Sequence, residues 1–221
     1  MNSEDKPEKY SEDYFLKSKY GIDTSMLSYE VLLNLNKWRL KKFRKVILQF
    51  SKDHKTLLDI GCAFGNFLSL FRNDFDLFGM DISEFAVAIA NLRLSCKIKQ
   101  ANVEELIPFK RRFDIITAID VVEHLGKPKI ALQNIYNHLN ENGLFFFQLT
   151  TVNNKKSKLI YDLFFSHDDT HIFIESIDEI HRLLSDTGLK KMAWYSTLFP
   201  IYTRNEKFVR DFCLAYLVYR K

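Results

Sequence analysis

Two carboxyl groups and one imidazole lie close together in the stretch Asp120-Val121-Val122-Glu123-His124. Side chains of these types transfer protons when they are placed beside a reacting group. Carboxylate oxygens and imidazole nitrogens are also ligands for divalent cations such as Mg²⁺, Mn²⁺ and Zn²⁺. The stretch therefore predicts either an acid–base site or a metal site, and the choice depends on what the fold places beside it.

A loop of small residues lies earlier in the chain, where residues 57–68 read LLDIGCAFGNFL. Gly61 and Gly65 are separated by Ala63 and its neighbours, and residues this small let a ligand come close to the backbone. The G-x-G-x-x-G fingerprint of dinucleotide-binding folds does not fit, because Asn66 occupies its third position. Asp59 stands at the end of the preceding apolar run, which also departs from that fingerprint.

The elements that must hold these residues follow from apolar runs that alternate with helical patterns. The runs predict strands at Thr56–Ile60, Leu77–Met80, Cys96–Ala101, Phe113–Ile119 and Leu144–Leu149, followed by late strands at Leu189–Thr197 and Phe212–Tyr219. Helical spacing covers Glu30–Phe50, Asn66–Phe71, Glu84–Leu94, Lys129–Leu139 and Ile177–Thr187. Such alternation indicates a doubly wound α/β domain with a mostly parallel sheet. Ligands of such sheets bind outside the carboxyl ends of the strands, where both features above lie.

The loop resembles motif I of the class I S-adenosylmethionine (SAM) methyltransferases, (D/E)-x-G-x-G-x-G, with Ala63 in place of the middle glycine. The resemblance continues in order through Gly79–Ser83, Ala101–Leu106 and the stretch FDIITAIDVVEHL at 113–125, which is close to the family's FDxIxxxxVLEHL. It covers about residues 55–150, and more loosely 170–188. The resemblance implies a seven-stranded, Rossmann-like sheet with an antiparallel last strand, and SAM as the cofactor.

By the same resemblance, Asp81 accepts hydrogen bonds from the ribose hydroxyls and Asn102 flanks the adenine. Asp59 has two open roles, a cofactor contact or a brace for the loop. Cys62 is interpreted as a packing residue of the loop rather than a nucleophile. The predicted cofactor-binding set is Asp59, Gly61, Cys62, Ala63, Gly65, Asp81, Ile82, Asn102, Val103 and Asp120.

Glu123, His124 and His171 are the predicted catalytic residues. The stretch from Asp120 resembles the ExxEH segment of ubiquinone-pathway and small-RNA methyltransferases, in which a distal histidine completes a divalent-metal site. His171 is the candidate for that distal residue, but Asp120 is one methylene shorter than the family's glutamate. We therefore assign no residue as a metal ligand. Two alternatives stay open: a divalent-metal site, or a role for His124 or His171 in orienting the acceptor or accepting its proton.

Three functions are compatible with the sequence. The first is methyl transfer from SAM to a small-molecule acceptor, most simply to an oxygen atom. The second is RNA methylation through the basic helix face at Lys37–Lys45, which predicts strong salt dependence of binding. The third is a non-catalytic SAM-binding protein, against which the retained loop argues.

The predicted division is an N-terminal arm or lid at 1–50 and a SAM-binding domain at 51–221, with an acceptor segment at 151–175. Aromatic residues expected in the lid are Tyr10, Tyr14, Phe15 and Tyr20. A helix carrying Leu159, Ile160, Leu163 and Phe164 is expected to cover the acceptor pocket.

Composition sets broad limits. The 221 residues carry a net charge of +4, three scattered cysteines and only seven glycines. The cysteines form neither a disulfide framework nor a metal motif, so we expect a reducing, cytoplasmic setting. No stretch reaches the roughly 18 apolar residues needed to span a bilayer, so we expect no membrane partner. Gly143 and Gly188 are predicted to end helices. The oligomeric state is not readable from the sequence.

Overall fold

The computed structural model describes Tyr10, Tyr14, residues 29–196 and residues 203–221, with side chains from Arg39 onward in the helix that begins at Tyr29. The predicted lid residues Phe15 and Tyr20, and the side chain of Lys37, lie outside the described part of the chain. No helix in the described residues is both long enough and apolar enough to cross a membrane.

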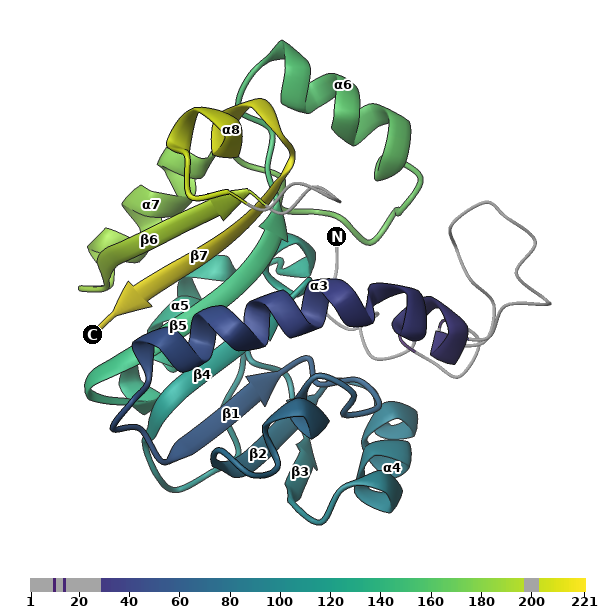
Figure 1. The fold of residues 1–221 in the computed structure, drawn as a ribbon, viewed down its shortest axis with the longest axis vertical. Coiled ribbons are helices and arrows are strands. Elements are labelled where there is room, and N and C mark those ends of the chain that lie inside the picture. Colours follow the sequence, from purple (N-terminus) through teal and green to yellow (C-terminus); the bar gives the residue numbers. More distant parts are fainter. Residues whose placement is uncertain (1–9, 11–13, 15–28, 197–202) are drawn as a thin grey trace.

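Seven strands form one sheet in the order β3-β2-β1-β4-β5-β7-β6 (Figure 1). The strands are β1 (Thr56–Ile60), β2 (Asp76–Asp81), β3 (Lys97–Gln100), β4 (Phe113–Ile119), β5 (Leu139–Thr150), β6 (Lys190–Ser196) and β7 (Leu214–Arg220). β7 is antiparallel to both of its neighbours, and the pairs from β3 to β5 are parallel. The predicted mostly parallel sheet with an antiparallel last strand is therefore confirmed.

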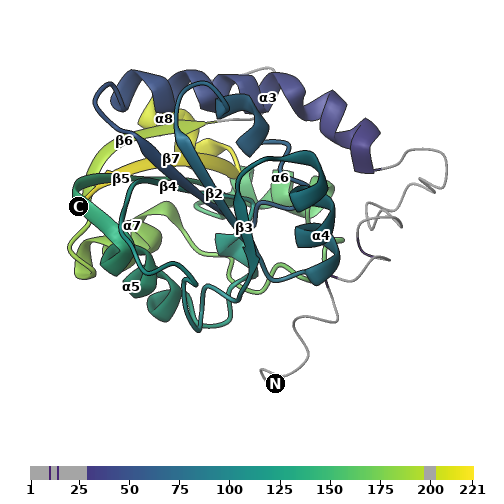
Figure 2. The same ribbon diagram turned by 90° about the horizontal axis from the view of Figure 1, so that it is seen from below.

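Helices cover both faces of the sheet (Figure 2). One face carries α3 (Tyr29–Phe50), the 3₁₀ helix η2 (Leu68–Phe71) and α4 (Glu84–Arg93), and the other carries α5 (Pro128–His138) and α7 (Ile177–Asp186). The two short helices α6 (Lys155–Phe164) and α8 (Glu206–Asp211) lie beyond the carboxyl end of β5 and beside β6 (Figure 1).

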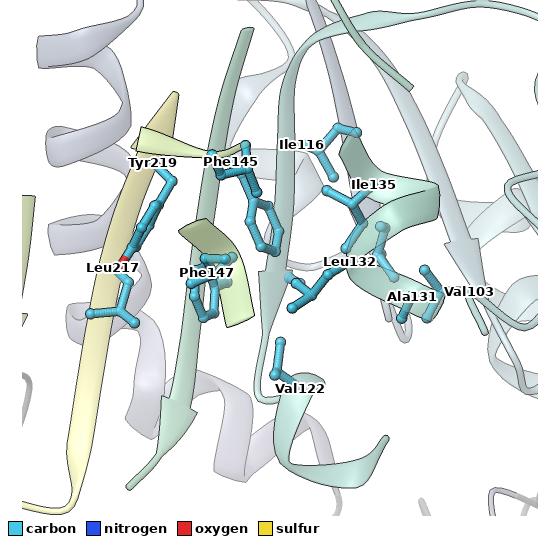
Figure 3. Packing of buried hydrophobic residues seen from close by; sticks show 14 of the residues in the cluster. Val103, Ile116, Val122, Ala131, Leu132, Ile135, Phe145, Phe147, Leu217 and Tyr219 are labelled. Carbon is cyan, nitrogen blue, oxygen red and sulfur yellow. The ribbon is translucent and has the colours of Figure 1, made fainter. Parts of the chain in front are cut away.

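The core explains why the strands read as nearly continuous apolar runs. Phe145 and Phe147 of β5 stack at 4.5 Å and face Leu132 and Ile135 of α5 (Figure 3). On the opposite face, Phe43 of α3 stacks on Tyr216 of β7 at 4.3 Å. Central strands buried on both sides leave few positions for polar residues, so polar residues concentrate where the strands end.

Two local predictions were wrong. The helical pattern at 66–71 becomes only the 3₁₀ turn η2, because Gly65 at φ +74° bends the chain directly before it. Gly143 does not end a helix: α5 stops at His138, strand β5 begins at once, and the left-handed residue of the turn is Asn142. Gly188 was predicted correctly, since its N–H and that of Leu189 bond back into the end of α7.

Candidate cofactor and acceptor site

The cofactor loop leaves β1 at Ile60 and turns toward β2. The N–H groups of Gly61 and Cys62 both donate to the carbonyl oxygen of Met80, at 2.8 and 3.1 Å. This pair of bonds fixes the loop at the carboxyl edge of the sheet, beside Asp81 at the end of β2. The loop after β1 and Asp81 at the end of β2 therefore lie side by side, as the sequence predicts.

Three residues of the loop have positive φ: Gly61 at +68°, Ala63 at +45° and Gly65 at +74°. A Cβ on Gly61 would overlap Val121 Cγ2, and one on Gly65 would overlap Leu94 Cδ1. The close approaches that require these glycines are therefore to side chains of the same chain. Their part in binding a cofactor stays a prediction.

Asp81 joins the first loop to the second. Its Oδ2 accepts the N–H of Ala63 at 2.8 Å and its Oδ1 accepts the N–H of Ser83 at 2.9 Å. Burial raises the pKa of this carboxyl, and backbone N–H donors at Ser83, Ala63 and Ile82 oppose that shift. Each oxygen keeps a further lone pair, so the predicted bonds to ribose hydroxyls are chemically compatible with this arrangement.

Asp59 braces β1 against β4. Its Oδ1 accepts the hydroxyl hydrogen of Thr117 at 2.6 Å, and the carboxyl is buried. Burial raises the pKa of Asp59 to about 7. This bond goes to strand β4 and not to an N–H group of the loop, so the two roles left open by the sequence, a cofactor contact and a brace for the loop, both stay predictions. Cys62 is also buried, and burial raises the pKa of its thiol, which agrees with a packing role.

The loop after β3 is held by one bond to its own side chain and by side chains of β3 and α5. Asn102 Oδ1 accepts the N–H of Glu104 at 2.9 Å, and the carbonyl oxygen of Val103 accepts from Asn134 of α5 at 2.8 Å. The carbonyl oxygen of Ile82 accepts from Gln100 at 3.1 Å. These bonds hold the predicted adenine-flanking residues in place next to the carboxyl ends of β2 and β3.

Asp120 follows β4 in a left-handed conformation, with φ +54°. Its Oδ2 pairs with Arg39 of α3 at 2.8 Å, its Oδ1 accepts from Gln148 Nε2, and its N–H donates to the carbonyl oxygen of Gln148. The strained backbone is thus held from both sides. Arg39 was not predicted as a site residue, because one more basic residue on a basic helix face gave no separate signal.

Glu123 is buried in the 3₁₀ helix η3 (Val122–His124). Its Oε1 accepts the N–H of Thr150 at 3.1 Å, while its Oε2 has no hydrogen-bond partner in the described part of the chain. Burial, with Asp120 nearby, raises the pKa of Glu123. Its carbonyl oxygen accepts the N–H groups of Ile172 and Phe173, at 3.0 and 2.9 Å.

These backbone bonds bring His171 to His124 although 46 positions separate Thr170 from His124. The two rings lie 4.8 Å apart, and one ligand atom from each of Glu123, His124 and His171 falls within 4.8 Å of the others. Burial lowers the pKa of both imidazoles, which favours their neutral forms. The three predicted catalytic residues therefore meet, whereas Asp120 turns to Arg39 instead of joining them.

Two aromatic residues of the arm lie across this edge. Tyr10 packs edge-on to His124, with ring centroids 6.2 Å apart, and contacts Tyr14 at 5.0 Å. Tyr14 packs in turn against the small cluster of Phe64, in the cofactor loop, and Ala86 of α4. The described residues of the arm thus contact Phe64 of the loop and His124, and the role of the arm as a lid stays a prediction.

Comparison with known families identifies the family of the chain. A family model described as a methyltransferase domain matches residues 35–193. The chain belongs to the class I SAM-dependent methyltransferase family. The chain is 33% identical over 147 residues to a carboxy-S-adenosyl-L-methionine synthase of Campylobacter concisus, a match that covers 61% of this chain and 59% of that protein. The chain therefore spans less than two thirds of the length of this relative.

Other relatives differ in what their names say they act on. A ubiquinone biosynthesis O-methyltransferase of Nitrosomonas europaea is 24% identical over 75% of this chain and 72% of its own. A tRNA U34 carboxymethyltransferase of Campylobacter jejuni is 26% identical over 80% and 60%. Among solved structures, a SAM-dependent methyltransferase from Clostridium acetobutylicum superposes with a TM-score of 0.65 at 16% identity, over 82% of this chain and 89% of that one. That last likeness concerns the fold.

The segment at 151–175, predicted to form the acceptor site, differs from its expected form. Tyr161 of α6 lies beside the histidine pair, with its hydroxyl oxygen 3.4 Å from His171 Nδ1. Leu159, Leu163 and Phe164 of the same helix are exposed rather than packed over the histidines. The prediction that these apolar side chains cover the pocket was wrong for these three residues.

The two described arginines on the basic face of α3 are engaged in contacts within the chain. Arg39 pairs with Asp120, and Arg44 donates to Asp74 and to the carbonyl oxygen of Leu70. Lys41 and Lys45 are exposed. Within the described side chains, the face is thus weaker as a phosphate-binding stripe than the sequence implied.

Proposed function

We propose that this protein transfers the methyl group of SAM to an oxygen atom of a small-molecule acceptor. The observation that carries the proposal is the meeting of Glu123, His124 and His171 at the carboxyl end of β4. An oxygen acceptor must lose a proton when it is methylated, whereas the sulfonium needs no further activation as a leaving group. A site with neutral imidazoles suits that need.

The proposed step is an in-line displacement. A lone pair of the acceptor oxygen forms the new O–CH₃ bond, and the electrons of the S–CH₃ bond return to sulfur, which leaves neutral S-adenosylhomocysteine. The acceptor proton passes to His124, so the positive charge moves from sulfonium to imidazolium. The lowered pKa of His124, caused by burial, keeps the imidazole unprotonated and ready to accept this proton at neutral pH.

The same residues fit a divalent cation. Glu123 Oε2 is a buried acceptor without a partner among the described residues, and Glu123, His124 and His171 offer one carboxylate and two imidazole ligands. A cation held there would act as a Lewis acid toward the acceptor oxygen. Asp120 would not take part, because Arg39 and Gln148 occupy its carboxylate.

Support for an oxygen acceptor comes also from the similarity to the ubiquinone biosynthesis O-methyltransferase, over three-quarters of the chain. The similarity to a tRNA-modifying relative keeps RNA as the rival acceptor. The engaged arginines of α3 argue against a broad RNA-binding face, since Arg39 and Arg44 both serve intramolecular contacts.

The test follows tritium from methyl-labelled SAM into three acceptors: catechol, simple phenols and bulk tRNA. Label in the phenolic products supports the proposal, and label in tRNA alone overturns the small-molecule part. SAM at millimolar concentration should raise the melting temperature, because a ligand that binds only the folded state stabilises it. Absence of that shift would overturn the proposal as a whole.

A chelator experiment distinguishes proton acceptance by His124 alone from a reaction assisted by a cation at Glu123, His124 and His171. Activity that survives EDTA and ignores added Mg²⁺, Mn²⁺ and Zn²⁺ supports proton acceptance by His124 alone. Activity lost with EDTA and restored by one of these cations supports the cation-assisted form.

A further inference from the structure

The hydrogen position on His124 follows from its surroundings. Its Nδ1 lies 3.1 Å from the carbonyl oxygen of Thr170 and 3.0 Å from the hydroxyl oxygen of the same residue. A carbonyl oxygen can only accept a hydrogen bond, so the nitrogen facing it must carry hydrogen. A neutral imidazole has one N–H, and the lone pair available for chemistry is then on Nε2.

Thr170 is itself fixed by Asp168. The carboxylate Oδ1 of Asp168 accepts the N–H of Thr170 at 2.9 Å and also its hydroxyl hydrogen. Because that hydrogen points to Asp168, the hydroxyl oxygen turns a lone pair toward Nδ1 of His124. Both oxygens of Thr170 that face the ring are therefore acceptors, and the residue is buried.

Backbone hydrogen bonds hold the segment that carries Asp168 and Thr170 in place relative to the imidazole ring of His124. The carbonyl oxygen of Glu123, one residue before His124, accepts the N–H groups of Ile172 and Phe173. These two bonds fix the register between η3 and residues 168–173. None of the hydrogen bonds found among the described residues uses Nε2 of His124.

We propose that Asp168 and Thr170 are positioning residues that hold His124 as the Nδ1–H tautomer, which leaves Nε2 as the nitrogen that accepts the acceptor's proton. The inference rests on the proposed function for the role of Nε2, but the tautomer itself is a property of the free protein. Neither Asp168 nor Thr170 takes part in methyl transfer. Their effect is to supply the right nitrogen in the right state, as oriented histidines require.

The test is nitrogen-15 NMR of the histidine side chains in the uniformly labelled protein without SAM or acceptor. The His124 signals are assigned by their loss in His124→Gln. The expected spectrum shows a protonated Nδ1 and an unprotonated Nε2. A protonated Nε2 in the free protein would overturn the proposal, whether or not methyl transfer is ever observed.

Variants then test the two positioning residues. The carbonyl oxygen of residue 170 remains in every variant, so Asp168→Ala and the similarly shaped Thr170→Val should raise the share of the Nε2–H tautomer without abolishing the Nδ1–H form. Thr170→Ser, which keeps the hydroxyl, should retain the wild-type spectrum. Asp162→Ala removes an exposed carboxylate of α6 that pairs with Lys158, and serves as the matched control. Wild-type tautomer populations in both Asp168→Ala and Thr170→Val would show that these residues do not set the tautomer. Thr170→Val keeps the proposal testable if Asp168→Ala does not fold.

Discussion

Arg39 of helix α3 pairs with Asp120 at the end of β4, with the guanidinium nitrogen 2.8 Å from Oδ2. The pair joins a helix that precedes the sheet to a left-handed residue at the carboxyl edge, 81 positions away. Gln148 of the neighbouring strand β5 holds the other carboxylate oxygen. Helix α3 therefore contributes to the geometry of the cofactor edge as well as to the core.

Arg39→Gln should weaken SAM binding about three- to tenfold, because loss of one charge-assisted bond frees the carboxylate of Asp120. Isothermal calorimetry gives the affinity. Arg44→Gln is the matched control on the same helix, since Arg44 pairs with Asp74 away from the cofactor edge. Equal affinities in wild type and Arg39→Gln would remove the ion pair from the cofactor site.

Gly61→Ala should destabilise the fold by about 2–4 kcal/mol, from a left-handed backbone and a steric overlap with Val121. Adding Val121→Ala to the Gly61→Ala variant should recover the part of the lost free energy of unfolding that comes from the steric overlap. The part that comes from the left-handed backbone should remain lost. Urea unfolding of the two single variants and the double variant measures the coupling. Strict additivity would contradict the assigned contact.

Asp59→Asn tests the buried carboxyl. The pKa of Asp59 rises from about 4 in the unfolded chain to about 7 in the fold, so the native state holds a proton that the unfolded state releases between these values. Its contribution to stability is therefore present at pH 4 and is lost as the pH rises to 7, by about 4 kcal/mol at most.

The Asn variant cannot ionise, so its stability relative to wild type should improve from pH 4 to pH 8. Chemical unfolding across this range measures the difference between the two proteins and cancels the other titrating groups. Parallel curves for wild type and Asp59→Asn would contradict the raised pKa.

Asp81→Ala should weaken SAM binding about tenfold or more, because one charge-assisted acceptor for a hydroxyl is worth about 1.5–3 kcal/mol. It should also lower the melting temperature of the free protein, since the N–H groups of Ala63 and Ser83 lose their acceptors. Comparison with Glu105→Ala, an exposed carboxyl of the loop after β3, separates this loss from a general charge effect. Unchanged SAM affinity would exclude the ribose role.

The order of the elements and the place of the cofactor loop were determined by the sequence itself. Apolar runs alternating with helical patterns require a parallel sheet covered on both faces, and residues at the strand ends must then share one edge. The motif from Asp59 to Gly65 and the stretch at Asp120–His124 were recognisable because their spacing is local. Similarly, Ser83 and Gly188 are helix-end signals that depend only on neighbouring residues.

The tertiary structure decided the contacts between residues far apart in the chain. It pairs Asp120 with Arg39 and places Thr170, which bonds to Asp168, against Nδ1 of His124. It also shows that the side chain of Val121 is the neighbour that excludes any residue larger than glycine at position 61. Such pairings depend on how β-strand ends, helix α3 and the 168–173 segment meet in space. No periodicity or local spacing encodes that meeting, because it results from packing the whole core.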